Sequence, residues 1–119
     1  MKSILIIDDA KVVAEVTALM LEKNGYKVYR AYSGRTGIEM ATALVPNLIL
    51  LDIMMPEISG WEVLDELRSN EKTKDIHILF FSAKVDDEEK SKDVAVDGFI
   101  AKPFDEDVIV EKIKKILGE

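Results

Sequence analysis

Residues 48–52, Leu-Ile-Leu-Leu-Asp, form a run of large apolar residues that ends in a carboxylate. An unbroken apolar run of this length is typical of a strand covered on both faces, as in a parallel sheet. Three further runs have the same form and also end in polar residues: residues 4–7 before Asp8 and Asp9, residues 78–81 before Ser82, and residues 99–101 before Lys102. The four runs predict a parallel sheet with three carboxylates, a hydroxyl and an ammonium at its strand ends.

The segments between these runs have the spacing of amphipathic helices. The first segment carries an apolar stripe of residues three and four positions apart: Val12, Val13, Val16, Leu19 and Met20. Gly25 is placed to end that helix. Ser33 is suited to cap a second helix, which Pro46 stops. A third helix is predicted after the loop at residues 56–60, and a last one over residues 105–117.

Alternating polarity at residues 26–31 predicts one more strand, at an edge of the sheet. The order of strands and helices then repeats as five strand–helix units with right-handed crossovers. We expect an α/β fold of the flavodoxin-like class, a doubly wound five-stranded parallel sheet in the order 2-1-3-4-5 within a (βα)5 three-layer sandwich. The 119 residues, of which 48% are apolar, suit one domain over residues 1–119.

The segment at residues 86–93, Asp-Asp-Glu-Glu-Lys-Ser-Lys-Asp, departs from this pattern because it lacks an apolar stripe. A helix with so few apolar residues gains little from packing and should open easily. Two interpretations stay open: a solvated surface helix held by its flanks, which we favour, and a mobile element used for switching.

The composition excludes several classes of protein. There is no cysteine, which excludes disulfides and thiolate metal sites and fits a cytoplasmic location. No apolar run reaches the ~20 residues that span a bilayer, and the net charge of −7 disfavours nonspecific binding to nucleic acid or anionic membranes. We expect no direct nucleic-acid binding and no membrane association.

The strand ends of a parallel sheet meet at one edge, where such folds bind ligands. Two like charges ~5 Å apart repel by roughly 3 kcal/mol at an effective dielectric of 20, so three clustered carboxylates require a cation. Asp8, Asp9 and Asp52 offer the hard oxygen ligands that suit Mg²⁺, with Mn²⁺ as the alternative ion. A carboxylate beside such an ion can accept a phosphoryl group as an acyl phosphate.

The residues that follow the strands form an ordered set of motifs: Asp8-Asp9, Asp52-Ile53-Met54-Met55-Pro56 with Gly60, Ser82-Ala83, and Phe99-Ile100-Ala101-Lys102-Pro103. In this order and spacing they resemble the receiver domain of two-component response regulators, and the stand-alone chemotaxis regulator in particular. The resemblance extends over essentially the whole chain. It implies that Asp52 is the phosphoacceptor, that Asp9 binds Mg²⁺ directly, and that Asp8 binds it largely through water.

The resemblance assigns further roles at the same edge. The backbone carbonyl of Met54 would be another metal ligand, while Ser82 and Lys102 would contact the phosphoryl group. The peptide bond between Lys102 and Pro103 is expected to be cis, an isomer that only an X-Pro bond adopts at low energy.

The resemblance also implies a switch. On phosphorylation, Ser82 would move toward the phosphoryl group and the ring of Phe99 would turn inward, changing the face formed by the fourth helix, fifth strand and fifth helix. Met54 and Lys84 occupy positions that tune the lifetime of the phosphoryl group. Because a methionine side chain cannot orient an attacking water, we predict slow self-hydrolysis.

The implied phosphodonor is a phosphohistidine on a sensor histidine kinase or a phosphotransfer protein; the sequence does not identify the downstream target. The domain would be a signalling phosphoacceptor rather than an enzyme with turnover. Two alternatives are an aspartyl-phosphate hydrolase, which typically has a second acid where Met54 stands, and a flavin-binding electron carrier, whose phosphate Asp8 and Asp9 would repel. A third is a structural receiver that is never phosphorylated. The chain fits either a single-domain regulator or the receiver part of a longer protein.

Overall fold

The computed structural model describes residues 1–119 except for the side chain of Val85. Its five strands are all parallel and form one sheet in the order β2-β1-β3-β4-β5, which confirms the predicted topology. The strands are β1 (Ser3–Ile7), β2 (Lys27–Ala31), β3 (Leu48–Asp52), β4 (His77–Ser82) and β5 (Gly98–Ala101). The helices are α1 (Lys11–Lys23), α2 (Gly34–Leu44), α3 (Gly60–Arg68), α4 (Val85–Ser91) and α5 (Glu106–Ile116).

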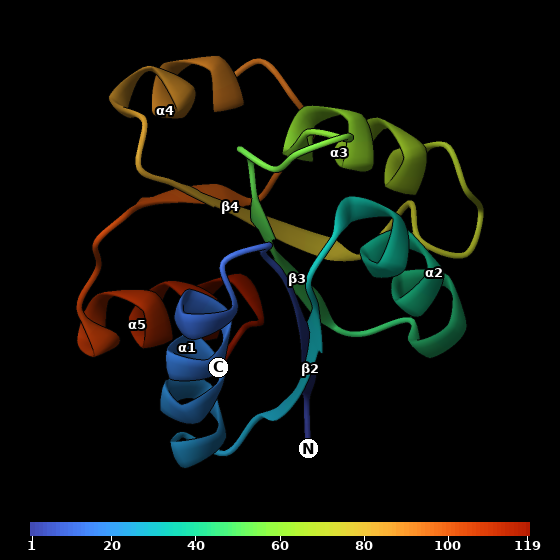
Figure 1. Cartoon of the computed structure of the whole chain (residues 1–119). Coiled ribbons are helices and arrows are strands. Elements are labelled where there is room, and N and C mark those ends of the chain that lie inside the picture. The colour runs from blue at the N-terminus through green and yellow to red at the C-terminus, as the bar shows by residue number, and fades with distance from the viewer.

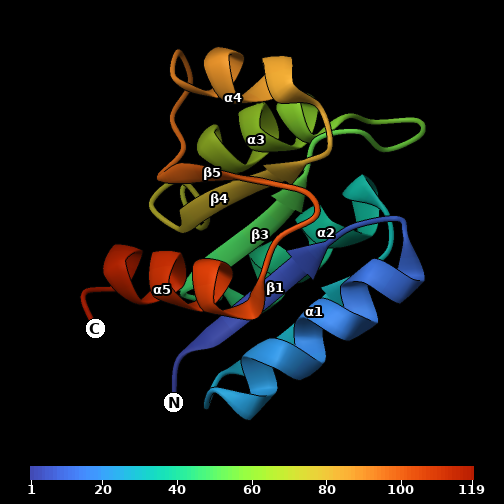
Figure 2. The same cartoon turned by 90° about the vertical axis from the view of Figure 1, so that its left-hand side faces the viewer.

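The helices cover both faces of the sheet. α1 and α5 lie on one face, and α2, α3 and α4 lie on the other (Figures 1 and 2). Successive residues of β3 therefore enter different cores: Leu48 and Leu50 pack in the cluster with α1 and α5, whereas Ile49 and Leu51 pack in the cluster with α2 and α3. This two-sided burial explains why the central strands are apolar at every position.

The face of α1 that packs on the sheet differs from the predicted stripe. The buried residues of α1 are Ala14, Thr17, Ala18 and Leu21. Val12 is 77% exposed and Leu19 is 64% exposed, so the prediction that they form the packing stripe is wrong. Small residues at positions 14 and 18 allow the helix backbone to approach the sheet closely, whereas Val12, Val16 and Leu19 are left on the outer side.

The helix α4 has a polar buried side. Asp87 is 3% exposed and Ser91 is 6% exposed, although both stand in the charged segment that we interpreted as a solvated surface helix. The helix begins and ends earlier than the segment at residues 86–93, and it has no side-chain cap at Lys84. Its attachment to the sheet thus includes polar contacts as well as apolar packing.

The helix α2 ends at a strained residue. Val45 has a φ of 44° and a ψ of 65°, a left-handed conformation that is unfavourable for a β-branched side chain. We expect Val45→Gly to raise the free energy of unfolding by about 1 kcal/mol, because glycine adopts this conformation without strain. The side chain is 50% exposed, so little burial is lost.

Urea denaturation of the two proteins measures this effect. Leu44→Gly is the matched control, since Leu44 is the last residue of α2 and is itself 41% exposed. It should lower stability by up to about 1 kcal/mol, as expected for glycine inside a helix. Equal losses in both variants would contradict the assignment of strain to Val45.

In the part of the chain that the structure describes, every helix is too short or too polar to cross a bilayer.

Candidate functional site

The carboxyl edge of the sheet gathers residues from distant parts of the sequence. Asp8 and Asp9 directly follow β1, and Asp52 is the last residue of β3. The three carboxylates offer oxygen atoms that all lie within 4.8 Å of one another. Lys102 follows β5 and reaches the same cluster from the far side of β4. The structure therefore brings together the four charged residues that the sequence placed at this edge.

The cluster is largely buried, and Lys102 pairs with two of its three carboxylates. The Lys102 Nζ atom lies 3.1 Å from Asp8 Oδ2 and 3.4 Å from Asp52 Oδ1. Asp8 is fully buried and Asp52 is 5% exposed. The other oxygen of Asp8 accepts a hydrogen bond of 2.9 Å from the backbone N–H of Ala10, which fixes the carboxylate. Asp9 is exposed and open to solvent.

One lysine does not neutralise this cluster, and the effect appears at Asp52. Burial first, and the neighbouring charge of Asp8 second, raise the pKa of the Asp52 carboxyl from its ordinary value of 3.8 to about 7, against the opposing effect of Lys102. A raised pKa means that the ionised form of Asp52 is disfavoured where it stands. A second cation beside Asp52 would remove this penalty.

The donor set fits a small hard divalent cation. The three ligands are carboxylates, and in the described side chains no histidine or cysteine belongs to the cluster. Mg²⁺ prefers oxygen ligands and keeps several waters, which the exposed position of Asp9 allows. Asp8, Asp9 and Asp52 are therefore suited to hold Mg²⁺, with the Met54 carbonyl as a further ligand in our prediction.

Ser82 ends β4 beside the charged cluster and is 1% exposed. Its hydroxyl donates a hydrogen bond of 2.6 Å to Asp87 Oδ2 and accepts one of 3.1 Å from the backbone N–H of Lys84. Sequence reasoning missed Asp87 because it stands in a charged run that resembles a solvated helix face. Its position five residues after Ser82, on the first turn of the next helix, was the available signal.

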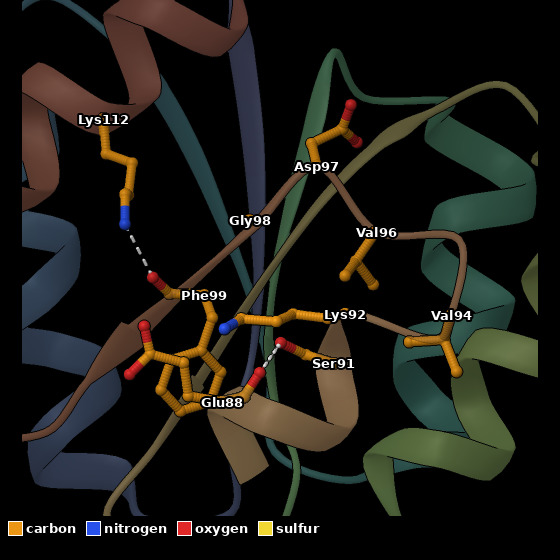
Figure 3. A pocket seen from close by; sticks show the side chains of 9 residues that line it. All are labelled: Glu88, Ser91, Lys92, Val94, Val96, Asp97, Gly98, Phe99 and Lys112. Carbon is orange, nitrogen blue, oxygen red and sulfur yellow. Dashed lines mark hydrogen bonds between the residues drawn. The ribbon is translucent and has the colours of Figure 1, made fainter. Parts of the chain in front are cut away.

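Phe99 lies away from the carboxylate cluster, on the α4 side of β5. Figure 3 shows its side chain extending toward α4, while its backbone carbonyl accepts a hydrogen bond of 2.8 Å from Lys112 on α5. The ring is already enclosed, because Phe99 is only 7% exposed and packs in the core with α2 and α3. The rotation of this ring on phosphorylation stays a prediction.

The remaining predicted residues lie around the rim. The peptide bond between Lys102 and Pro103 is cis, the isomer that the resemblance implies. The side chain of Met54 is 57% exposed. Met54 and Lys84 both border an open hollow of about 460 Å³, which Asp87 and Trp61 also line. Their influence on the lifetime of a phosphoryl group stays a prediction.

The chain matches known proteins over nearly its whole length. The family model of the response regulator receiver domain matches residues 4–114. The chain is 32% identical over 120 residues to the polar-differentiation response regulator DivK of Brucella ovis, and the match covers 99% of this chain and 98% of DivK. It is 35% identical over 119 residues to the DNA-binding dual master transcriptional regulator RpaA of a Synechocystis strain, covering 98% of this chain but only 49% of RpaA. The chain thus spans about half the length of RpaA.

A solved structure shares both the fold and part of the sequence. The response regulator protein TrrA from Thermotoga maritima, in complex with Mg²⁺ and BeF, has a TM-score of 0.89 to this chain at 34% identity, and the match covers 98% of this chain and 99% of TrrA. The chain therefore belongs to the family of response regulator receiver domains, which act in phosphorylation-based two-component signalling.

Proposed function

We propose that Asp52 accepts a phosphoryl group from a phosphohistidine on a sensor histidine kinase or a phosphotransfer protein. The observation that carries this proposal is the position of Asp52, a buried carboxylate 3.4 Å from Lys102 within a cluster of acids suited to a divalent cation. In the transfer, the bond between phosphorus and the imidazole nitrogen breaks, a bond between phosphorus and an Asp52 oxygen forms, and the imidazole leaves.

The attacking oxygen must be ionised, and the burial of Asp52 opposes this. Asp8, Asp9 and Asp52 would hold Mg²⁺, with the Met54 carbonyl completing the protein ligands. When bound, the ion supplies positive charge that favours ionised Asp52 and offsets the negative charge of the incoming group. Asp8 is fully buried and fixed by the Ala10 N–H, which makes the position of that carboxylate well defined.

Lys102 and Ser82 would hold the phosphoryl oxygens. The Lys102 ammonium is already poised between Asp8 and Asp52, so it can move from Asp52 to a phosphoryl oxygen with a small change in position. The Lys102 backbone N–H donates to the Ser82 carbonyl at 2.8 Å, which couples the two strand ends that carry these groups. Ser82 would donate its hydroxyl hydrogen to another phosphoryl oxygen.

The product would act as a signal rather than as an intermediate of turnover. We propose that phosphorylation changes the face formed by α4, β5 and α5, with Ser82 and Phe99 as the switching residues. Residues 1–119 would form one receiver domain in the cytoplasm, with no direct binding to nucleic acid or membranes. The DNA-binding activity in the name of RpaA belongs to that protein.

The hydrolase alternative is less well supported. Met54 stands where such enzymes typically have a second acid, and its side chain is apolar and 57% exposed. We expect the phosphorylated protein to lose its phosphoryl group slowly, over times longer than seconds, in the absence of other proteins. The flavin carrier is disfavoured because Asp8 and Asp9 present negative charge where a flavin phosphate would bind.

Intact-mass spectrometry after incubation with acetyl phosphate and Mg²⁺ tests the proposal. The wild-type protein should gain one phosphoryl group, and the gain should be lost when a chelator removes the metal. Asp52→Asn should gain none, because the amide has no nucleophilic carboxylate oxygen. A gain in Asp52→Asn equal to that of the wild type would reject Asp52 as the acceptor.

A further inference from the structure

The Ser82 hydroxyl donates a hydrogen bond to Asp87, which lies outside the cluster of acidic residues and Lys102. A serine hydroxyl has one hydrogen to donate, and here it forms the bond of 2.6 Å to Asp87 Oδ2. Both partners are buried, with Ser82 1% exposed and Asp87 3% exposed. A short bond from a hydroxyl to a carboxylate in such surroundings is among the stronger hydrogen bonds in proteins.

Asp87 depends on this bond. Among the side chains that the structure describes, Ser82 is the one that donates to the Asp87 carboxylate. If the hydroxyl turned away, a buried carboxylate would be left without a side-chain donor, which is unfavourable. The bond also joins the first turn of α4 to the end of β4, on a helix of seven residues whose N-terminus has no side-chain cap.

We infer that Asp87 is a positioning residue that holds the Ser82 hydroxyl in a resting orientation and thereby opposes the phosphorylated state. The inference rests on the proposed function, in which Ser82 donates to a phosphoryl oxygen. To donate to a phosphoryl oxygen, the Ser82 hydroxyl must break its hydrogen bond to Asp87. The phosphorylated form is therefore less stable by the free energy of that hydrogen bond. Breaking this hydrogen bond would remove a contact between α4 and β4, and phosphorylation of Asp52 would thereby change the position of α4.

The surroundings of α4 leave space for such a change. A hollow of about 260 Å³ lies between α4, β5 and α5, and Figure 3 shows Glu88, Ser91 and Lys92 of the α4 region at its border with Phe99. On its other side, Asp87 itself borders the hollow of about 460 Å³ beside Met54 and Trp61. A small movement of α4 would allow the Asp87 carboxylate to reach solvent there once Ser82 has left it.

Calorimetric titration with beryllofluoride in saturating Mg²⁺ tests the inference, since this anion imitates a phosphoryl group on Asp52. We expect Asp87→Ala to bind it about 10-fold more tightly than the wild type, which corresponds to about 1.4 kcal/mol. Asp87→Asn should lie between the two, because its amide oxygen can still accept from Ser82 but carries no charge. Thermal unfolding of each variant verifies that it is folded.

Two controls separate the bond from other effects of the substitution. Asp86→Asn removes the same charge from an exposed neighbour on the same turn of α4 and should leave the affinity unchanged within about 2-fold. In a Ser82→Ala background, adding Asp87→Ala should also have little effect, because Asp87 acts through the Ser82 hydroxyl. A purely structural role of Asp87 in α4 would persist without Ser82.

The outcomes distinguish this inference from the proposed function. If the wild type bound no beryllofluoride and gained no phosphoryl group, the proposed function would fail. If the wild type bound it and Asp87→Ala bound it equally or more weakly, the role of Asp87 would be rejected while the function stood. An equal gain in Asp86→Asn and Asp87→Asn would likewise reject the bond as the cause and assign the effect to charge.

Discussion

Asp52→Asn should make the protein more stable than the wild type in the absence of Mg²⁺, by a margin that grows as the pH rises from about 4 to about 7. The pKa of Asp52 is raised from 3.8 to about 7 in the folded protein, through burial first and Asp8 second. Between these values the folded state binds a proton that the unfolded state has lost. Stability therefore falls as the pH rises through this window, and it levels off above pH 7.

The size of the effect follows from the shift. One pKa unit corresponds to about 1.4 kcal/mol, so the difference between the two proteins should reach a few kcal/mol at pH 8. Asparagine is uncharged at every pH in this range, so the variant does not lose stability through the burial of a charge at position 52. Urea denaturation of both proteins at pH 4, 6 and 8, with a chelator present, measures the difference in their free energies of unfolding. A difference that stayed constant across this range would show that Asp52 does not have a raised pKa in the folded protein.

Mg²⁺ provides the complementary measurement. A ligand that binds only the folded state stabilises it in proportion to the logarithm of its concentration. At pH 8, Mg²⁺ should stabilise the wild type and narrow its difference from Asp52→Asn, because the variant lacks one of the three carboxylates. An equal gain in both proteins would indicate that the metal binds elsewhere.

Much of the fold was predictable because the central strands carry a strong local signal. The apolar run at residues 48–52 is buried on both faces, and its carboxyl end lies where the topology places it. The strand order brings the carboxyl ends of β1, β3 and β5 to one edge, and the residues at those ends are Asp8, Asp52 and Lys102. Strand order and residue type together were therefore enough to predict the charged cluster.

The details that sequence reasoning missed depend on side-chain size and on polar pairing. The packing face of α1 includes the small residues Ala14 and Ala18, whose weak hydrophobicity is hidden by the larger Val13 and Leu19 next to them. Asp87 is buried because the hydroxyl of Ser82 satisfies it, and a charged residue in a charged run gives no sign of such a partner. The spacing of hydrophobic residues does not show where a helix lies close to the sheet, and it does not show which buried polar side chains form hydrogen bonds with one another.

The start of α3 illustrates how close approach fixes the site. Gly60 is the first residue of α3, directly after Ser59, which forms a capping box with Glu62. The backbone N–H of Gly60 donates to the Ile53 carbonyl at 2.8 Å, which ties the helix to the loop that follows Asp52. A Cβ atom on Gly60 would lie 2.5 Å from the Asp52 carbonyl oxygen and 2.6 Å from the Ile53 Cα.

Gly60→Ala should therefore lower the free energy of unfolding by roughly 3 kcal/mol, at the upper end of the usual cost of overpacking, and weaken Mg²⁺ binding. Both clashing atoms belong to the backbone, so α3 or the loop that carries Asp52 and Met54 must move to admit the methyl group. Gly98→Ala is the matched control, because its Cβ would meet only the ends of two flexible side chains, Leu79 at 3.2 Å and Ile116 at 3.9 Å. Urea denaturation and Mg²⁺ titration of both variants compare the two positions. If Gly60→Ala lost no more stability and no more Mg²⁺ affinity than Gly98→Ala, contact between α3 and the Asp52 loop would not be what holds the acceptor in place.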